Sequence, residues 1–541
     1  MPKPKPNPST PTPAEPAAPA VPPKATADDR PPLPPGWVWT TIGDVTSPVE
    51  KVDPREQPDF EFVYLDISSI DNHAHRIVSP KRYRGREAPS RARQLVRKHD
   101  VLFSTVRVYL RNIALVPPQY DGQIASTGFA VLRGNQAIEP KYLFFYTLTD
   151  DFIERLNHLQ RGTSYPAVRD RDVRAQSIPL APLPEQRRIV AKIEERFSQL
   201  DAAEEGLRRV QRNLKRYRAA VLKAAVEGRL VPRGRGDPAD RPHETGAELL
   251  QRILAERRRK WEEQEWAKLV EKAKKKAAQA RRKAQGRPAR LKDIPPEEWQ
   301  AIPEEEYRRY LPKDDRWKQK YKEPTPPDTA NLPPLPEGWA WATVEMISET
   351  VGGVTKGRRL LGRKTIQVPY LRVANVQRGF LDLKVVKVIE IPEEELGKYA
   401  LQKYDVLLTE GGDWDKLGRA AVWHEQIKPC IHQNHIFRAR PFLFKEMLGQ
   451  WIAYVANSEF GQRYFTNAAK QTTNLASINL TQLRACPIPL PPLAEQRRIV
   501  VEVERRLSVA QEAEKAVEAN LKRIARLRQA ILKRAFEGRL V

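Results

Sequence analysis

The chain has 541 residues, enough for several domains with sizeable cores. Its 94 Lys and Arg residues outnumber 68 Asp and Glu, and the net charge of +26 points to a polyanionic partner, most often nucleic acid, with a ribosomal or membrane surface as the alternative. Two cysteines, Cys430 and Cys486, exclude a disulfide scaffold and suit a reducing cytosol, and no apolar run approaches the ~20 residues that span a bilayer.

The chain opens on a proline-rich stretch, residues 1–32, which predicts a disordered or extended tail and shows no secretion signal. A Leu-Pro-Pro-Gly-Trp-Val-Trp stretch from Leu33 then opens a first globular segment, and Leu-Pro-Glu-Gly-Trp-Ala-Trp from Leu335 opens a second. Each segment mixes strand-like runs with a helical pattern and closes on Ile-Pro-Leu, at 178–180 and at 488–490. Both are therefore predicted to be α+β. Between these shared boundaries the two sequences barely align, so the frame is duplicated and the contents have diverged.

A 49-residue stretch follows each segment, at 183–231 and again at 493–541, and 23 of the 49 positions are identical. Apolar residues recur every three or four positions in both copies, which predicts two long amphipathic helices. Their apolar stripes need partners, so we predict an antiparallel coiled coil with pseudo-two-fold symmetry, whose seam includes Val210, Tyr217 and Leu527. The alternative is that each helix lies separately on its own globule.

An insertion, residues 232–334, separates the first long helix from the second segment. Thr245 and Glu248 match a capping box, and the Ala, Glu, Lys and Arg content that follows predicts a long, solvated helix. Beyond Arg287 the sequence is proline-broken and aromatic. We interpret the insertion as a helical, basic linker that packs along the coiled coil. A phosphate-binding or partner-docking role for its basic clusters, 257–260 and 274–276, is the less favoured alternative.

Catalytic patterns are missing from the sequence. It has no phosphate loop, no Asn/Asp-Pro-Pro-aromatic signature of amino-methyltransferases, no glycine-rich cofactor loop, no His-Glu-x-x-His and no paired CxxC. One cluster, His424, Cys430, His432 and His435, could in principle hold zinc, but strand alternation would point its side chains to different faces. The sequence therefore predicts no catalytic residue, no metal site and no bound cofactor.

The duplicated frame, the Leu-Pro-x-Gly-Trp openings and the Glu-Gln-Arg-Arg-Ile-Val and Glu-Gly-Arg-Leu-Val helix ends resemble the specificity (S) subunit of a Type I restriction–modification enzyme, over nearly all of residues 33–541. The resemblance implies target recognition domains at 33–182 and 335–492, separated by spacer helices at 183–231 and 493–541. It implies a cytoplasmic protein that binds double-stranded DNA, two modification (methyltransferase) subunits and restriction (translocase/nuclease) subunits. S-adenosylmethionine, ATP and Mg would belong to those partners.

DNA contacts are expected in polar loops beside strands, where Arg and Lys clamp phosphates and Arg, Asn or Gln read base edges. Solvated surface charge is the alternative for each residue. In the first domain, phosphate candidates are Arg82, Arg84, Arg86, Arg91 and Arg93, and base or backbone candidates are Ser104, Thr105, Arg107, Tyr109, Arg111, Arg161, Thr163, Ser164 and Tyr165. In the second, phosphate candidates are Lys356, Arg358, Arg359, Arg363 and Lys364, and loops that resemble those of the family contain Glu410, Gly411, Gly412, Asp413, Lys416, Arg419, Gln433, Asn434, His435, Lys470, Gln471, Thr472 and Asn474.

The charged starts of the two long helices are candidate docking surfaces for methyltransferase subunits, because the family resemblance places partners there. The residues are Glu185, Gln186, Arg187, Arg188, Glu495, Gln496, Arg497 and Arg498. The alternative is that they cap and pair within the coil.

Two unlike reading heads on a rigid spacer would recognise a bipartite, asymmetric site with half-sites about 10 bp or a little more apart. Two other classes of function compete with this one. A fused restriction–methyltransferase would need the cofactor motifs that the sequence lacks. A structural coiled-coil protein would not explain why the globules diverged within a duplicated frame.

Overall fold

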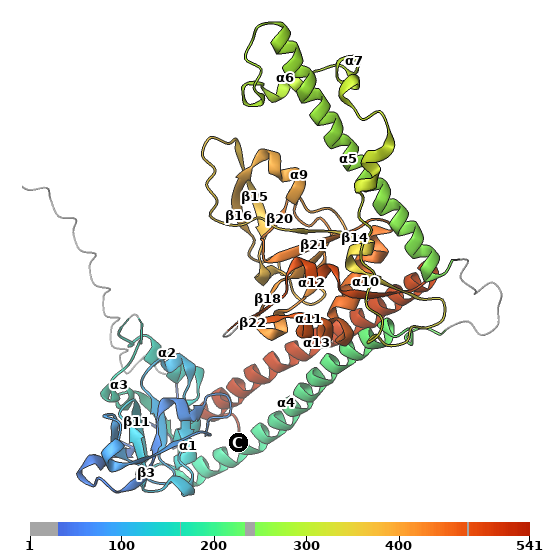
Figure 1. Cartoon of the computed structure of the whole chain (residues 1–541). Coiled ribbons are helices and arrows are strands. Elements are labelled where there is room, and N and C mark those ends of the chain that lie inside the picture. Colours follow the sequence, from blue (N-terminus) through green and yellow to red (C-terminus); the bar gives the residue numbers. More distant parts are fainter. Residues whose placement is uncertain (1–30, 163, 233–243, 473–474) are drawn as a thin grey trace, which may run out of the picture. The chain divides into compact units, whose positions relative to one another are not determined.

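The computed structural model describes residues 31–162, 164–232, 244–472 and 475–541 (Figure 1). The chain divides into two compact units: residues 1–208 with 518–541, and residues 209–517. Each unit holds one globule and one section of each long helix. We call residues 33–182 globule 1 and residues 335–492 globule 2. The Thr163 and Asn474 candidates, residues 1–30 of the tail and residues 233–243 of the insertion lie outside the described residues.

Globule 1 is built on two four-stranded sheets, and its predicted α+β character is confirmed. Its strands are β1 (Val38–Thr41), β2 (Thr46–Ser47), β3 (Glu61–Leu65), β4 (Ile70–Asp71), β5 (Arg76–Ile77), β6 (Lys81–Arg84), β7 (Ala92–Leu95), β8 (Val101–Ser104), β9 (Ile113–Leu115), β10 (Ile124–Ser126), β11 (Phe129–Gly134) and β12 (Ser177–Leu180). The sheet orders are β2-β11-β8-β9 and β6-β3-β10-β7, and β4 forms a small hairpin with β5. An antiparallel β1–β12 pair joins the Gly-Trp opening to the Ile-Pro-Leu exit.

Globule 2 repeats this topology. Its strands are β13 (Ala340–Thr343), β14 (Ser348–Gly352), β15 (Thr365–Leu371), β16 (Lys387–Pro392), β17 (Val406–Thr409), β18 (Gly411–Gly412), β19 (Ala420–Val422), β20 (Ile431–His432), β21 (Ile436–Pro441), β22 (Lys470–Thr472), β23 (Leu475–Ser477) and β24 (Pro487–Leu490). The order β14-β21-β17-β19 matches β2-β11-β8-β9, and the parallel β15–β20 pair matches β3–β10. A third sheet, β18-β23-β22, is added in globule 2. The duplication therefore extends into the interior of the globules, although their sequences barely align.

The short helices pack against these sheets. They are α1 (Pro140–Thr147), α2 (Asp150–Asn157) and α3 (Asp170–Arg174) in globule 1, and α8 (Val344–Ile347), α9 (Leu396–Tyr399), α10 (Lys445–Asn457), α11 (Glu459–Ala468) and α12 (Leu480–Arg484) in globule 2. Equivalent side chains fix α1 and α10 to the exit strands: the Tyr142 hydroxyl donates to the Pro179 carbonyl at 2.8 Å, and the Trp451 indole donates to the Pro489 carbonyl at 2.7 Å.

A buried Asp–Arg pair recurs at the same place in both globules. Asp100 precedes β8 and accepts two hydrogen bonds from Arg133 at 3.0 and 2.9 Å, and Asp405 precedes β17 and accepts two from Arg440, both at 2.7 Å. Each aspartate also accepts from a backbone N–H three residues earlier, at 2.8 Å. Both are 1% exposed or less, so the pairing compensates for the cost of burying the charges.

The two long helices are α4 (Leu183–Val226) and α13 (Leu493–Phe536). They end five residues before the predicted boundaries because Gly228 and Gly538 take left-handed φ values of 66° and 67°. In the first unit Ile189 and Ile193 share a core with Leu532, and Asp201 pairs with Arg528, so the two sections run antiparallel. The second unit repeats this arrangement, with Arg218 2.9 Å from Glu514. Antiparallel packing is thus present within each unit.

Several positions of the predicted seam were wrong, including the three named above. Val210, Tyr217 and Leu527 are 43%, 41% and 39% exposed. Two packed helices cover only a narrow stripe of each other, and residues that fit a spacing of three or four can still lie beside that stripe. Where the globules do not add cover, ion pairs such as Glu204–Arg528, at 3.0 Å, flank the stripe instead.

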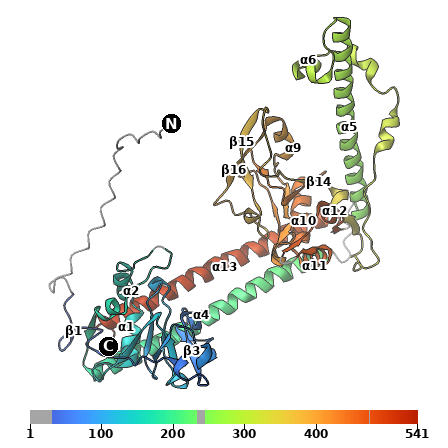
Figure 2. The same ribbon diagram turned by 60° about the vertical axis from the view of Figure 1, so that its left-hand side comes forward.

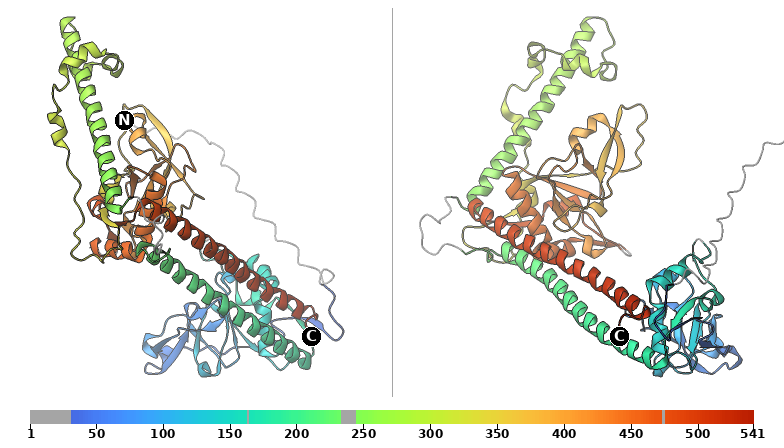
Figure 3. Two further views of the ribbon diagram at one scale, coloured as in Figure 1. Left: turned by 90° about the vertical axis from the view of Figure 1, so that its right-hand side faces the viewer. Right: turned by 180° about the vertical axis from the view of Figure 1, so that it is seen from behind.

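The insertion forms an arm, residues 246–322, in the second unit. It contains α5 (Gly246–Ala284), α6 (Pro296–Gln300) and α7 (Glu304–Tyr307). The predicted capping box is confirmed, since Thr245 accepts from the Glu248 amide and Glu248 accepts from the Thr245 amide. Contrary to the expectation, the arm does not pack along the long helices, because its root is held by globule 2 (Figures 2 and 3). No helix in the described part of the chain is long and apolar enough to cross a membrane.

Candidate nucleic-acid interface

In globule 1, three polar segments meet at one edge of the β8–β11 sheet. We call residues 104–111, 126–128, 161–162 and 164–167 rim 1. Backbone hydrogen bonds hold them together: Thr105 N–H donates to the Gly128 carbonyl and Val168 N–H donates to the Thr105 carbonyl, both at 2.9 Å. The Arg107 guanidinium donates to the Ser164 carbonyl at 3.1 Å and lies over the Tyr165 ring at 4.6 Å. The Tyr165 side chain remains 70% exposed.

Globule 2 builds an equivalent edge, rim 2, from residues 409–419, 433–435, 470–472 and 475–478. Glu410 N–H donates to the His435 carbonyl at 3.0 Å, and Ile478 N–H donates to the Glu410 carbonyl at 2.9 Å, which repeats the bonding of Thr105. At Gly411 a Cβ atom would meet the Ala476 carbonyl oxygen at 2.2 Å, so the close approach of β18 and β23 requires glycine.

Rim 2 presents different side chains on this shared frame. The His435 ring hydrogen-bonds to the Glu410 carboxylate, and Lys416 pairs with Asp413. Arg419 pairs with Asp415 and donates to the Gln377 side chain at 3.0 Å. The structure thus brings the predicted 410–419, 433–435 and 470–472 segments together. The side chains of Gln471 and Thr472 are outside the described part.

The sequence did not predict Trp414 of rim 2, nor Gln377 and Arg378 beside the rim. The Arg378 guanidinium donates to the Asp415 carbonyl at 2.8 Å beside Arg419, and its Nη1 is buried with no hydrogen-bond partner in the structure. Burial, and then the charge of Arg419, lowers the pKa of Arg378. Trp414, next to this pair, is 47% exposed. No local motif links residues 377–378 to 414–419, because only tertiary folding brings them together.

In globule 1 the missed segment is 126–128, the counterpart of 433–435. A sequence signal for it existed. Lys98-His-Asp-Val-Leu102 and Lys403-Tyr-Asp-Val-Leu407 align the two central strands at an offset of 305, and this offset matches Gly128 to Gln433, at the start of the 433–435 segment.

Two predicted rim 1 residues differ in exposure. Tyr109 is 50% exposed, whereas Arg111 pairs with Asp150 and donates to the Leu148 carbonyl at 3.2 Å. Arg111 is therefore directed toward α2. Arg161 pairs through its backbone with Ala167 and keeps an exposed side chain.

The phosphate candidates are largely engaged by carboxylates. Arg84 pairs with Glu61 at 3.1 Å and Arg86 with Asp59, while Arg93 pairs with Asp53 at 2.9 Å and its side chain is 22% exposed. Arg82 and Arg91 are exposed. In globule 2 the acidic turn Glu393–Glu395 binds Arg358, Arg363 and Lys364. Lys356 and Arg359 stay exposed without an ion pair among the described residues. Phosphates would have to compete with these carboxylates at the paired positions.

The docking prediction is wrong for three of its eight residues. Gln186 and Gln496 are 0% exposed and Glu495 is 5% exposed. Gln186 accepts from Glu139 N–H at 2.8 Å and donates to two carbonyls, and Glu495 accepts from the Trp339 indole at 3.0 Å. These side chains fix the helix starts to the globules.

The other five docking candidates are not buried. Glu185 is half-buried, and Arg187, Arg188, Arg497 and Arg498 are exposed. The second arginine pair, like the first, therefore remains accessible at the start of its helix.

The metal-like cluster is dispersed by the strands. Cys430 and His432 are buried, whereas His435 lies on rim 2. Burial lowers the pKa of His432 to about 4 and raises that of the Cys430 thiol to about 12. No three His, Cys, Asp or Glu side chains in the described part of the chain form a metal-ligand group.

Comparisons with known proteins agree with this duplicated arrangement. The family model described as "Type I restriction modification DNA specificity domain" matches residues 67–210 and 338–522. The Escherichia coli EcoKI specificity subunit is 32% identical over 178 residues, 32% of this chain and 37% of that one. The StySPI specificity subunit of Salmonella potsdam is 22% identical over 411 residues, 76% and 67% of the two chains. The chain thus spans about a third of the first relative and two thirds of the second.

A solved structure on complex assembly and conformational transition of the type I R-M system contains a similar chain. The two are 29% identical with a TM-score of 0.59, and the match covers 94% of this chain and 100% of the other. Two matches to one family model, over more than half of the sequence, place the chain in the family of type I restriction–modification DNA specificity subunits.

Proposed function

We propose that this chain is the non-catalytic specificity subunit that reads a bipartite, asymmetric DNA site, with one half-site bound by each globule. One observation supports this most directly. Rims 1 and 2 share the same backbone hydrogen bonds but carry unlike side chains, Arg107 and Tyr165 in one and Glu410, His435 and Arg419 in the other. Two edges with the same backbone structure and different polar side chains can bind two different base sequences.

The rim side chains have the chemistry that base reading needs. An arginine can bind guanine with two parallel hydrogen bonds, and a carboxylate can accept from cytosine. The exposed aromatic rings of Tyr165 and Trp414 offer apolar surface at the same edges. Exposed cations outside the rims, including Arg82, Arg91, Lys356 and Arg359, would contact phosphates and set the register.

We assign DNA methylation and DNA cleavage to partner subunits. Two modification subunits would dock at the arginine pairs Arg187–Arg188 and Arg497–Arg498, and restriction subunits would join them. S-adenosylmethionine, ATP and Mg would bind to those subunits and not to this chain. The long helices would act as the spacer that fixes the gap between half-sites.

Single arginine substitutions test the assignment of one half-site to each rim. Arg107→Lys and Arg419→Lys keep the charge but lose the planar fork, so each should cost about 1–3 kcal/mol of discrimination at one base pair. The measurement is competition binding of the chain, co-expressed with its methyltransferase subunit, to duplexes with single base-pair changes.

The matched control is Arg463→Lys, because Arg463 lies on α11 outside the rim and its side chain is 70% exposed. It should leave every base preference unchanged. If Arg107→Lys and Arg419→Lys relaxed both half-sites equally, or neither, the one-rim, one-half-site proposal would be refuted.

A further inference from the structure

The arm is anchored firmly at its root. Leu249, Leu250 and Ile253 of α5 are buried in the core that they share with globule 2. Further along the helix, the Lys260 ammonium donates to the Phe442 carbonyl at 2.7 Å. Beyond this root the arm extends away from the sheets of globule 2 (Figures 1 to 3).

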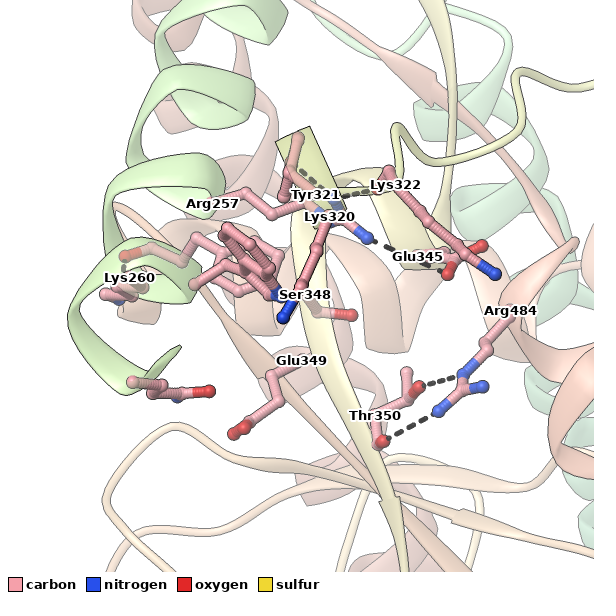
Figure 4. Close-up of a pocket in the computed structure, with 13 residues that line it drawn as sticks. Arg257, Lys260, Lys320, Tyr321, Lys322, Glu345, Ser348, Glu349, Thr350 and Arg484 are labelled. Carbon is pink, nitrogen blue, oxygen red and sulfur yellow. Dashed lines mark hydrogen bonds and ion pairs between the residues drawn. The ribbon is translucent and has the colours of Figure 1, made fainter. Parts of the chain in front are cut away.

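A second set of contacts fixes the segment that follows α5, which returns along the arm, to the root of the arm. Trp261 stacks on Trp317 at 6.2 Å and meets Tyr321 at 5.3 Å, and Arg257 approaches Glu345 at 3.8 Å. Arg257, Trp261, Tyr321 and Glu345 line a cavity of about 360 Å³ against β14 of globule 2, where Arg484 donates to Thr350 at 2.7 Å (Figure 4). The root of the arm is therefore packed against globule 2 by both α5 and the returning segment.

The outer half of the arm has its own small core. Ala277 and Ala278 of α5 are buried against Ile294 and Ile302. The Arg282 side chain, 7% exposed, donates to Glu298 at 2.8 Å and to the Asp293 carbonyl at 2.7 Å. The returning segment thus covers one side of α5 and leaves the other side open to solvent.

The open side carries a stripe of unpaired cations. Residues 268–292 contain eleven Lys and Arg and one carboxylate, Glu271. Lys272, Lys276 and Lys283 lie within about 40° of one another around the helix axis, at 100° per residue, and Arg287 follows them. All four are exposed, and none forms an ion pair with the described residues. We call these four residues the basic stripe.

Nearby acidic residues do not cancel this charge. The whole outer arm, residues 268–310, holds 13 Lys and Arg against seven Asp and Glu. Two of those carboxylates pair with arginines outside the stripe: Glu298 with the buried Arg282, and Glu306 with the exposed Arg281 at 3.8 Å. The stripe therefore attracts a polyanion.

The composition of the arm favours nucleic acid over a protein partner. Trp266 and Leu291 are its only large hydrophobic residues that are markedly exposed in the described structure. A protein-docking surface usually has a more apolar, aromatic centre. A row of lysines and an arginine, by contrast, matches the repeating charge of a phosphate backbone.

We propose that the basic stripe binds the phosphates of duplex DNA that flanks the half-site read by globule 2, independently of sequence. This rests on the proposed DNA-reading function. Lys272 and Lys283 lie 12 and 23 residues beyond Lys260, or roughly 18 and 35 Å at 1.5 Å per residue. At 3.4 Å per base pair, that reach corresponds to about 5–10 bp of flanking duplex.

The test replaces the stripe in the full chain, co-expressed with its methyltransferase subunit. The variant K272Q/K276Q/K283Q/R287Q removes four charges, and K272R/K276R/K283R/R287K is the charge-preserving control. Glutamine and lysine have similar helix propensities, so α5 should persist, which circular dichroism can verify. Binding is measured between 50 and 200 mM salt on two duplexes, one trimmed to the outer edges of the bipartite site and one extended by 20 bp on each side.

The wild type and the control should bind the extended duplex more tightly than the trimmed one, with a steeper salt dependence. The glutamine variant should lose this advantage, with a slope lower by about 3–4 on the extended duplex, since each phosphate contact contributes about 0.9. On the trimmed duplex the wild type, the control and the glutamine variant should bind with equal affinity.

Three results would overturn the proposal: equal binding of variant and wild type to the extended duplex, an equal loss on both duplexes, or loss of methyltransferase assembly with DNA binding unchanged. The last result would identify the stripe as a protein-docking surface. Absence of any sequence-specific binding by the wild type would instead count against the proposed function itself, so the two failures are distinguishable.

Discussion

Removing residues 205–211 from α4 together with residues 520–526 from α13 should abolish recognition of the native site and create recognition of a site with a shorter gap. Seven residues of α-helix span about 10.5 Å, or up to about 3 bp of duplex. A heptad also keeps the packing face within about 20°, so the helix sections on either side can pack as before. The two half-site sequences should not change, because neither rim is altered.

Deletion of residues 205–211 alone is the control. It shifts α4 relative to α13 and breaks ion pairs such as Arg218–Glu514, so it should lose specific binding at every gap. Selection of duplexes from a pool with randomised gap lengths measures both variants. An unchanged gap in the double deletion would show that the helices do not set the spacing.

Asp405→Ala should destabilise globule 2 by about 3–5 kcal/mol, the usual cost of removing one partner from a buried ion pair. Asp405 is 0% exposed, and its loss would strand Arg440 beside Arg438, which is 2% exposed. Burial and then the neighbouring Arg440 already lower the pKa of Arg438, whose remaining carboxylate partner is Glu349 at 3.2 Å. Arg440 would then lose the one ion-pair partner that it has among the described residues, next to the buried guanidinium group of Arg438.

Hydrogen exchange measured by mass spectrometry reports this loss locally, which matters because a chain of several domains need not unfold in one step. Amides of β17 and β21 should exchange faster in Asp405→Ala, and those of β8 and β11 should not. Asp100→Ala should show the reverse pattern. Glu512→Ala removes a pair that is 69% and 62% exposed and should change neither. Unchanged exchange of β17 in Asp405→Ala would mean that the pair is dispensable.

The parts of the fold that sequence predicts well are those with local signals. The periodicity of 183–231 and 493–541, the glycines that end both helices and the Thr245–Glu248 capping box each lie within a few residues of one another. The Gly-Trp openings and Ile-Pro-Leu exits were visible as repeated motifs, and they pair as β1–β12 and β13–β24.

The failures concern side chains whose surroundings come from distant parts of the chain. Gln186 and Glu495 read as surface residues because they sit among charged neighbours, but the folded globules cover them. Val210 and Tyr217 have apolar side chains at helical spacing and still lie beside the packed stripe. Burial is a property of the tertiary structure, so pattern alone could not assign it.

In the candidate interface, too, residues with local sequence signals were predicted and residues placed by tertiary contacts were missed. Arg107 and Arg419 were accessible to prediction because polar loops follow strong strand patterns at 101–104 and 405–409. Arg378 was not, because its place beside Arg419 depends on a contact across 37 residues with Asp415. The acidic turn at 393–395 likewise engages Arg358 and Lys364 from a separate loop.

The most direct test of the two-headed account is selection of bound duplexes from a random pool by the wild-type chain co-expressed with its methyltransferase subunit. The account predicts two unlike short sequences at one constant gap. Salt-sensitive binding with no enriched sequence would leave only attraction between the +26 chain and phosphates, and would contradict the assignment of one half-site to each globule.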